Sequence, residues 1–368
     1  MISKLKSLLY QGYIWNAAKL RTRVRWRGPV AMDFPRLFYG RDHIPGQDEN
    51  ACGGIIKVQD LQTAYPNHNR GANILYLVSS ALPALAPDMV RYAKKYGAKL
   101  VLNQNGTAYP AWHGPGWERT NLPLRQVMGM ADYVFYQSEF CKKAADLYLT
   151  PRDDLFEVLH NPVDTARFIP VKRKLGGHKL ISAGTHNQLY RVKCAVETVG
   201  ILKREIPDIH LTFAGQYYWH SNPDQARAEL VEMVRKLDLD EHISIQGKYS
   251  QNEIVRLLQD HHIFLHTKYN DPCPRSVSEA LACGLPVVHS CSGGVPELVS
   301  PNAGVGVAAP LDWLEIHVPA PQDLAKGIIR VFSDYEKYST AARRQGVSKL
   351  DVLPWINRHK EIFQEMIS

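Results

Sequence analysis

The sequence lacks paired cysteines, long hydrophobic runs and internal repeats. Its 368 residues include six cysteines, none in a CxxC pair, which argues against a disulfide framework or a zinc ribbon. The longest apolar stretch, residues 74–87, is too short and too interrupted by proline to span a bilayer. No apolar leader with a cleavage site opens the sequence, so we expect a protein of the reducing cytoplasm.

Acidic residues are missing from the first part of the sequence. Seven lysines and arginines precede the first acid, Asp33, and supply most of the net charge of +8. They alternate with apolar residues such as Leu8, Leu9 and Trp15, a pattern typical of an amphipathic segment on an anionic membrane surface. We expect a basic arm over residues 1–30 that either holds the protein on the inner membrane face or is solvated or docked on the first domain. The remainder is nearly neutral, and we expect no nucleic-acid partner.

The length suffices for two domains. From residue 37 onward, short β-rich runs alternate with helical patterns, as in parallel sheets with crossover helices. This alternation predicts an α/β fold with two doubly wound, Rossmann-like halves and a ligand at the carboxyl ends of their strands. The predicted strands are 37–39, 74–78, 99–102, 133–136 and 156–159, then 180–183, 210–213, 242–246, 263–266 and 286–289. The predicted helices are 55–62, 87–95, 124–130 and 139–149, then 193–203, 225–237, 251–259, 276–282 and 296–299, with a last helix from 354.

The stretch 271–299 carries the strongest functional signal. It places two carboxylates, Asp271 and Glu279, around a proline-rich turn that opens a helix, and a second turn, Gly293-Gly294, opens another helix. Helix N-termini offer unpaired N–H groups and a positive dipole end to an anion. Ionised carboxylates accept hydrogen bonds from sugar hydroxyls. A nucleoside diphosphate sugar supplies both an anion and hydroxyls.

The residues of this stretch, EALACGLPVV and GGVPELV, resemble the signature of the retaining glycosyltransferases of family 4. The segment NPVDTARFIP at 161–170 resembles that family's interdomain segment, and ACGGIIKV at 51–58 its N-terminal glycine turn. The resemblance implies the GT-B architecture, with domains at 31–168 and 169–350 facing a cleft and a final helix, 351–368, that crosses back to the first domain. It also implies transfer of a sugar from a nucleoside diphosphate sugar to a glycan or lipid-linked acceptor, without a cofactor.

The resemblance assigns the donor site. Asp271, where the family usually has Glu, is expected to contact the donor sugar, and Glu279 the ribose hydroxyls. Arg191 and then Lys193 are the expected diphosphate cations, because Thr185 and Tyr190 occupy the family's usual Arg and Lys positions. The alternative is that both are solvated cations on a first helical turn. The donor site is completed by Gly53, Gly54, Thr185, His186, Arg275, Ser276 and Val277. The glycine pair could also be an ordinary turn, and Ser276 a helix cap.

The segment 99–121 combines amides, aromatic rings and glycines just beyond a predicted strand, which suits a carbohydrate acceptor. The expected acceptor residues are Asn103, Asn105, Trp112 and Trp117. The family's usual His is absent from this position. His113 is a candidate catalytic residue and His186 an alternative, although a loop histidine is more often structural or solvated.

A metal ion is not expected. Asp238-Leu239-Asp240 resembles the metal-binding DxD of another glycosyltransferase fold, but it ends a predicted helix instead of following a strand. Two other functions stay open from the sequence. The chain could be a sugar-nucleotide epimerase of the same architecture, or a nucleotide-sugar binding protein without catalysis.

Overall fold

The computed structural model describes residues 20, 24–26, 28–46, 49, 53–172 and 176–368. The chain divides into two compact units. The first is Met1–Leu159 together with Leu353–Ser368, and the second is His160–Val352. Most of the predicted basic arm, including residues 1–19, lies outside the described residues.

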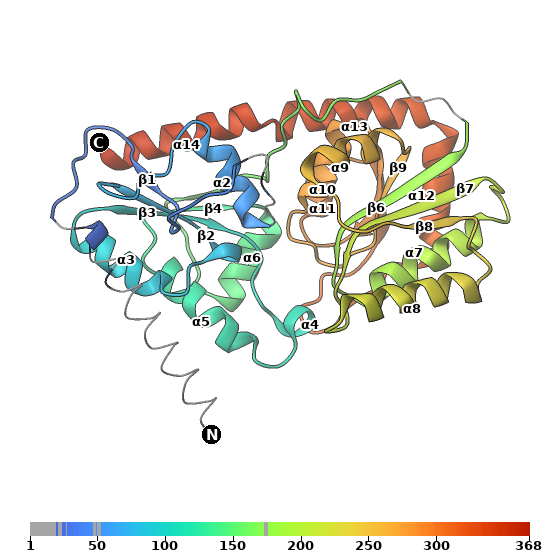
Figure 1. Cartoon of the computed structure of the whole chain (residues 1–368), viewed down its shortest axis with the longest axis horizontal. Coiled ribbons are helices and arrows are strands. Elements are labelled where there is room, and N and C mark those ends of the chain that lie inside the picture. The colour runs from blue at the N-terminus through green and yellow to red at the C-terminus, as the bar shows by residue number, and fades with distance from the viewer. Residues whose placement is uncertain (1–19, 21–23, 27, 47–48, 50–52, 173–175) are drawn as a thin grey trace. The chain divides into compact units, whose positions relative to one another are not determined.

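The first unit is built on a parallel sheet with strand order β1-β2-β3-β4-β5 (Figure 1). Its strands are apolar and buried, as expected for a parallel sheet covered by helices. They are β1 Leu37–Phe38, β2 Ile74–Val78, β3 Lys99–Gln104, β4 Tyr133–Tyr136 and β5 Phe156–Val158. The helices are α2 Gly54–Gln62, η1 Ser79–Ala81, α3 Ala86–Lys95, α4 Pro110–His113, α5 Trp117–Met128 and α6 Glu139–Tyr148.

The last helix of the chain, α14 Val352–Ile367, completes the core of the first unit. Its side chains Trp355, Ile362 and Phe363 are buried in one cluster with residues of β1, β2 and β3. His359 on the same face is fully buried, and its Nε2 lies 3.0 Å from the hydroxyl of Tyr76. The first unit therefore draws on segments from both ends of the sequence.

The first unit also begins earlier than residue 31. Trp26 is 1% exposed, its ring packs edge-on against Phe38, and its indole N–H donates to the carbonyl oxygen of Ala72. The guanidinium of Arg25 lies 3.7 Å from the centre of the Phe38 ring and forms an ion pair with Asp42. These two residues, which the sequence analysis assigned to the basic arm, are part of the first unit because a buried aromatic anchors them.

The second unit has a parallel sheet with strand order β11-β10-β9-β6-β7-β8. From β6 the chain proceeds to one side, and from β9 to the other, so the strand order reverses between these two neighbours. The strands are β6 His178–His186, β7 Ile209–Tyr217, β8 Ile243–Ile245, β9 Ile263–His266, β10 Val287–Cys291 and β11 Gly304–Ala308. The helices are α7 Leu189–Leu202, α8 Pro223–Lys236, α9 Gln251–Gln259, α10 Arg275–Ala282, α11 Val295–Leu298, α12 Pro321–Ser333 and α13 Tyr335–Leu350.

Three elements of the second unit were not predicted from the sequence: β11, α12 and α13. Strand β11 contains Gly304 and Gly306, and glycine weakens a strand pattern. Glycine is needed there, since a Cβ on Gly304 would lie 2.0 Å from the carbonyl oxygen of Val287 on β10. Helix α12 covers these strands with Leu324 and Ile328 buried one turn apart.

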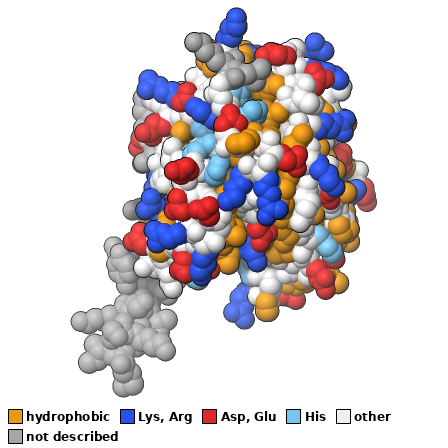
Figure 2. Space-filling view, turned by 90° about the vertical axis from the view of Figure 1, so that its right-hand side faces the viewer, with side chains coloured by type: hydrophobic (Ala, Val, Ile, Leu, Met, Phe, Trp, Pro, Cys, Tyr) orange, Lys and Arg blue, Asp and Glu red, His pale blue; other side chains and the backbone are white. Residues whose placement is uncertain are grey.

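The molecular surface carries both signs of charge. On the face shown in Figure 2, acidic and basic side chains are interspersed, which is typical of a solvated protein surface. Among the described residues, no helix combines the length and the hydropathy needed to cross a bilayer.

Candidate functional site

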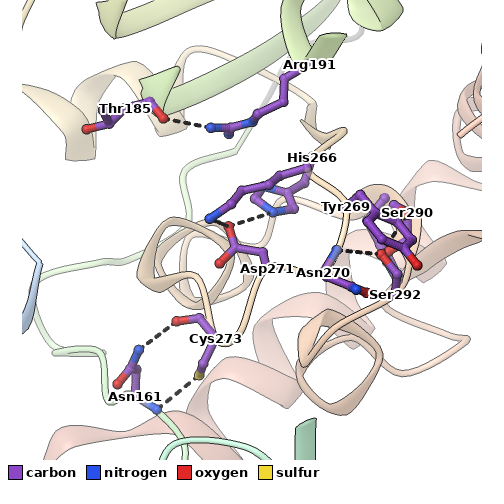
Figure 3. Close-up of polar contacts among 12 residues, drawn as sticks. Asn161, Thr185, Arg191, His266, Tyr269, Asn270, Asp271, Cys273, Ser290 and Ser292 are labelled. Atoms are coloured by element: carbon purple, nitrogen blue, oxygen red, sulfur yellow. Dashed lines mark hydrogen bonds and ion pairs between the residues drawn. The ribbon is translucent and has the colours of Figure 1, made fainter. Parts of the chain in front are cut away.

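The reversal of strand order in the second unit places two loops at one point. Strand β6 leads into α7, and β9 leads through residues 267–274 into α10. Because these two connections diverge to opposite sides, a crevice is expected between them at the strand ends. Arg191 lies in the first turn of α7 and Asp271 in the loop after β9, and Figure 3 shows both at this point.

Asp271 is a buried carboxylate held by Lys268 and His266. Its Oδ2 lies 3.2 Å from Nζ of Lys268 and 3.3 Å from Nε2 of His266, and all three residues are buried or nearly so. Burial alone would raise the pKa of the Asp271 carboxyl, but Lys268 and His266 outweigh burial and hold that pKa well below its usual range. Asp271 is therefore ionised at neutral pH, as an acceptor of sugar hydroxyls must be.

Arg191 connects the ends of the two strands. It is only 6% exposed, its Nη1 donates to the carbonyl oxygen of Thr185 at 2.6 Å, and its own carbonyl oxygen accepts a bond from the hydroxyl of Thr267. Burial lowers the pKa of Arg191, while the charge of Asp271 opposes that change. The guanidinium and the Asp271 carboxylate thus interact within one cluster at the switch point. The Thr185 side chain itself is exposed.

Lys193 is not part of this cluster. Its side chain is 58% exposed and its Nζ lies 3.9 Å from Glu197, one turn further along α7. Residues two apart on a helix do not face the same side, so Lys193 and Arg191 point in different directions. The second cation of the site is instead Lys268, which the sequence analysis missed because a single lysine in a loop usually indicates a solvated side chain.

Tyr190 stands where the resembled family has lysine, and it supports the loop after β9. Its hydroxyl accepts a hydrogen bond from the backbone N–H of Tyr269 at 3.0 Å. Burial raises the pKa of Tyr190 to about 12, so the hydroxyl stays neutral. Tyr190 is therefore a neutral support for the loop after β9.

His186 is enclosed within the second unit. It is 1% exposed, and its ring stacks on Tyr217 with centroids 5.4 Å apart. Burial, together with the nearby Arg191, lowers the pKa of His186 to about 3. The imidazole is therefore neutral and a weak base, which is unfavourable for the general-base role considered for it in the sequence analysis.

The turn after β10 braces the Asp271 loop. Asn270 has a left-handed backbone conformation, with φ of 51°, and its N–H donates to the hydroxyl of Ser292 at 2.9 Å. Gly294 N–H donates to the carbonyl oxygen of Asp271, also at 2.9 Å. Helix α11, which follows, has only four residues. We expected this turn to present a helix N-terminus to an anion, but its N–H group at Gly294 is used to hold Asp271.

Helix α10 carries a charged pair. Nε of Arg275 lies 3.1 Å from Oε1 of Glu279 one turn later, and both side chains are largely buried. Ser276 lies beside Arg275 and is partly exposed. Val277 is fully buried in the core, and its N–H donates to the carbonyl oxygen of Pro274, so its side chain is a packing one and its donor-binding role stays a prediction.

The glycine pair of the first unit has a steric explanation. Gly53 precedes α2 with a positive φ of 56°, which favours glycine. At Gly54, a Cβ would lie 2.5 Å from Cγ1 of Val78 and 2.7 Å from the hydroxyl of Ser80. The start of α2 therefore packs directly against the end of β2.

The expected acceptor residues divide into two groups. Asn103 and Asn105 are buried, and their side-chain oxygens accept hydrogen bonds from Lys57, a residue that the sequence analysis did not single out. Trp112 is 38% exposed on the short helix α4, whereas Trp117 packs edge-on against Tyr148.

His113 lies on the exposed surface at the end of α4. Its Nε2 is 2.8 Å from the hydroxyl of Thr120, and its Nδ1 is near the carbonyl oxygen of Gly114. These contacts are consistent with the structural alternative for this histidine, and its catalytic role stays a prediction.

The DxD-like triplet is not arranged for a metal ion. Leu239 is fully buried, while Asp238 is fully exposed and lies 3.7 Å from Lys203. Among the described residues, metal-ligand atoms come within 4.8 Å of one another at Asp312, Glu315 and His317. There, His317 already lies 2.8 Å from the Asp312 carboxylate.

Comparisons with known proteins agree on the class of fold. Residues 166–345 match the family model described as "Glycosyl transferases group 1". Among solved structures, the chain is similar to HepE from Anabaena in complex with UDP, at 18% identity, with a TM-score of 0.65 and coverage of 84% of this chain and 81% of that chain. It is also similar to sucrose-phosphate synthase from Thermosynechococcus elongatus, at 13% identity, with a TM-score of 0.70 and coverage of 92% and 99%. These likenesses show the α/β fold of GT-B proteins, as predicted.

The curated relatives are longer than this chain. The chain is 23% identical over 226 residues, or 61% of its own length, to a Homo sapiens protein named as part of phosphatidylinositol N-acetylglucosaminyltransferase. The chain spans 44% of that protein's length, and 36% of the length of the Arabidopsis thaliana counterpart.

Proposed function

Because residues 166–345 match the family model described as "Glycosyl transferases group 1", we propose that the chain transfers a sugar from a nucleoside diphosphate sugar to a glycan or lipid-linked acceptor, with retention of anomeric configuration. One observation carries the proposal. A buried, ionised Asp271 sits with Lys268 and Arg191 at the point where the strand order of the second unit reverses. Charged groups are kept in such a buried position at functional sites.

The proposed roles of Asp271 and Glu279 are those that the family resemblance implies. Asp271 accepts hydrogen bonds from the transferred sugar, and Glu279 accepts them from the ribose hydroxyls. The departing diphosphate gains negative charge, which Arg191 and Arg275 stabilise together with N–H groups at the start of α10. In retaining transfer the donor phosphate takes the acceptor proton, so no histidine base is required.

The names of similar proteins support the donor class. HepE was solved with UDP, and the human relative is named for transfer of N-acetylglucosamine to phosphatidylinositol. We further propose a cytoplasmic protein held on the inner membrane face by its basic arm. Sedimentation with anionic liposomes tests this second proposal, which fails if a variant lacking residues 1–23, which keeps the buried Trp26, sediments as well as the full chain.

Incubation with a panel of nucleoside diphosphate sugars tests the function. Release of the nucleoside diphosphate together with a glycosylated acceptor is the expected result. An isomerised donor would instead identify an epimerase, and binding without turnover would identify a non-catalytic protein. The same assay with a chelator tests metal independence, which complete loss of transfer would overturn.

A further inference from the structure

A buried cation lies beneath the glycine turn of the first unit. Lys57, in the first turns of α2, is 3% exposed, and its Nζ lies 2.5 Å from Asn103 Oδ1, 2.6 Å from Asn105 Oδ1 and 3.3 Å from Gln137 Oε1. A neutral amine has only two N–H bonds, so three acceptors around one nitrogen require the ammonium form. Positive charge is therefore held at the carboxyl ends of β3 and β4.

This ammonium fixes the direction of a chain of hydrogen bonds. Lys57 can only donate, so Asn105 must turn its oxygen toward Lys57 and its NH₂ group away. The NH₂ group donates to the hydroxyl oxygen of Ser80 at 2.5 Å, and the Asn105 backbone N–H donates to the hydroxyl of Ser79. Since the Ser80 oxygen accepts from Asn105, its own hydrogen points elsewhere.

The chain of hydrogen bonds ends at the surface beside the glycine turn. Ser80 is exposed, and its oxygen would lie 2.7 Å from a Cβ placed on Gly54. Inside a protein, successive hydrogen bonds polarise one another, so a cation at one end strengthens the donor at the other end. A hydroxyl donor polarised by a nearby cation suits an anion, which only accepts hydrogen bonds. It suits a sugar hydroxyl less well, because a hydroxyl both donates and accepts them.

We propose that Ser80 is a ligand-binding donor to phosphate oxygens bound at the Gly53-Gly54 turn of the first unit, and that Lys57 is the positioning residue which, through Asn105, points the Ser80 hydroxyl toward them. This inference rests on the proposed function. It adds a side-chain donor to the backbone N–H groups at the Gly53-Gly54 turn.

Two substitutions test the inference by calorimetric titration with UDP and with pyrophosphate as a base-free probe. Ser80→Ala removes the donor and should lower the affinity for UDP and for pyrophosphate about tenfold, which is the typical effect of losing a hydrogen bond to a charged group. Asn105→Asp keeps an oxygen for Lys57 but offers Ser80 a second acceptor, which turns the hydroxyl inward. Asn105→Asp should lower both affinities at least as much as Ser80→Ala does. The double variant should bind both ligands no more weakly than Asn105→Asp alone.

Uridine and a matched variant serve as controls. Uridine has no phosphate, so its affinity, followed by ligand-observed NMR, should not change in Ser80→Ala. If Ser80 had only a structural role, the substitution would weaken uridine binding as well. Thr63→Ala removes an exposed hydroxyl at the other end of α2 and should leave all three affinities unchanged. Unchanged UDP and pyrophosphate affinity in Ser80→Ala, an equal loss for uridine, or a wild-type protein that binds neither phosphate ligand would overturn the inference. Failure of every donor in the panel would instead overturn the proposed function.

Discussion

Gly293 lies directly against the carbonyl oxygen of Asp271, from which a Cβ at position 293 would be only 2.5 Å away. The neighbouring atoms are backbone of Asn270 and Asp271, which cannot move without displacing the Asp271 side chain. The geometry of the candidate site therefore depends on the absence of a Cβ at position 293.

Gly293→Ala should displace the Asp271 loop and reduce donor binding and transfer at least tenfold, with a loss of stability of about 2 kcal/mol or more from the clash and the positive φ. Gly71→Ala is the matched control, because Gly71 has nearly the same φ, 67°, with nothing within 4 Å of its Cβ position. Calorimetry measures the donor affinity of both variants, and thermal unfolding measures their stability. A similar loss of affinity in both would contradict this account.

Asp271→Asn should abolish most transfer and destabilise the second unit. The neutral amide leaves Lys268 and Arg191 buried without their carboxylate, and removal of one partner of a buried ion pair costs about 3–5 kcal/mol. Denaturant unfolding and initial rates measure the two effects. If the variant is as stable as the wild type, the cations at this site are not compensated by Asp271.

Glu279→Ala should weaken nucleoside diphosphate binding by about 1–3 kcal/mol, because a charged acceptor of hydrogen bonds is removed. Lys193→Ala serves as the control in the same unit, since its exposed side chain points away from the cluster. Binding is measured by calorimetry on folded variants. Unchanged affinity in Glu279→Ala would remove this residue from the site, and a loss in Lys193→Ala would restore the role first expected of that lysine.

Acid should destabilise both units through buried histidines. Burial lowers the pKa of His186 in the second unit and of His359 in the first unit to about 3, from about 6.5 in the unfolded chain. The unfolded state therefore binds more protons below pH 6.5, so the free energy of unfolding decreases as pH falls from 6.5 toward 3, by up to about 1.4 kcal/mol per pH unit for each group.

Urea unfolding between pH 7 and pH 4.5 measures this slope. His359→Phe should lower the stability at pH 7, because the contact with the Tyr76 hydroxyl is lost, yet reduce the slope below pH 6.5. An identical slope in the variant would mean that His359 is accessible to protons in the folded state.

The alternation of the sequence predicted most strands and helices of the fold. Strand β11 was not predicted because it contains Gly304 and Gly306, where packing against β10 overrides strand propensity. Trp26 shows the converse case. Its cationic neighbours predict part of a basic arm, whereas a single buried indole fixes this segment to the first unit.

The candidate site was predicted through its motif positions but not through its contacts. Asp271 and Arg191 lie at the ends of adjacent strands, as expected from their place after β9 and β6. Val277 faces the core and Lys193 faces solvent, because a shift of one or two positions along a helix moves a side chain to a different face. Lys57 and Lys268 were missed because only the folded chain reveals that a lysine is buried.

The position of α14 determines the order in which the protein can form during synthesis. Trp355, Ile362 and Phe363 complete the core of the first unit, yet the ribosome adds them after the whole of His160–Val352 has been made. The first unit therefore cannot finish folding until the second unit has been synthesised. Until then, the apolar surface that α14 covers must remain exposed to water or to chaperones.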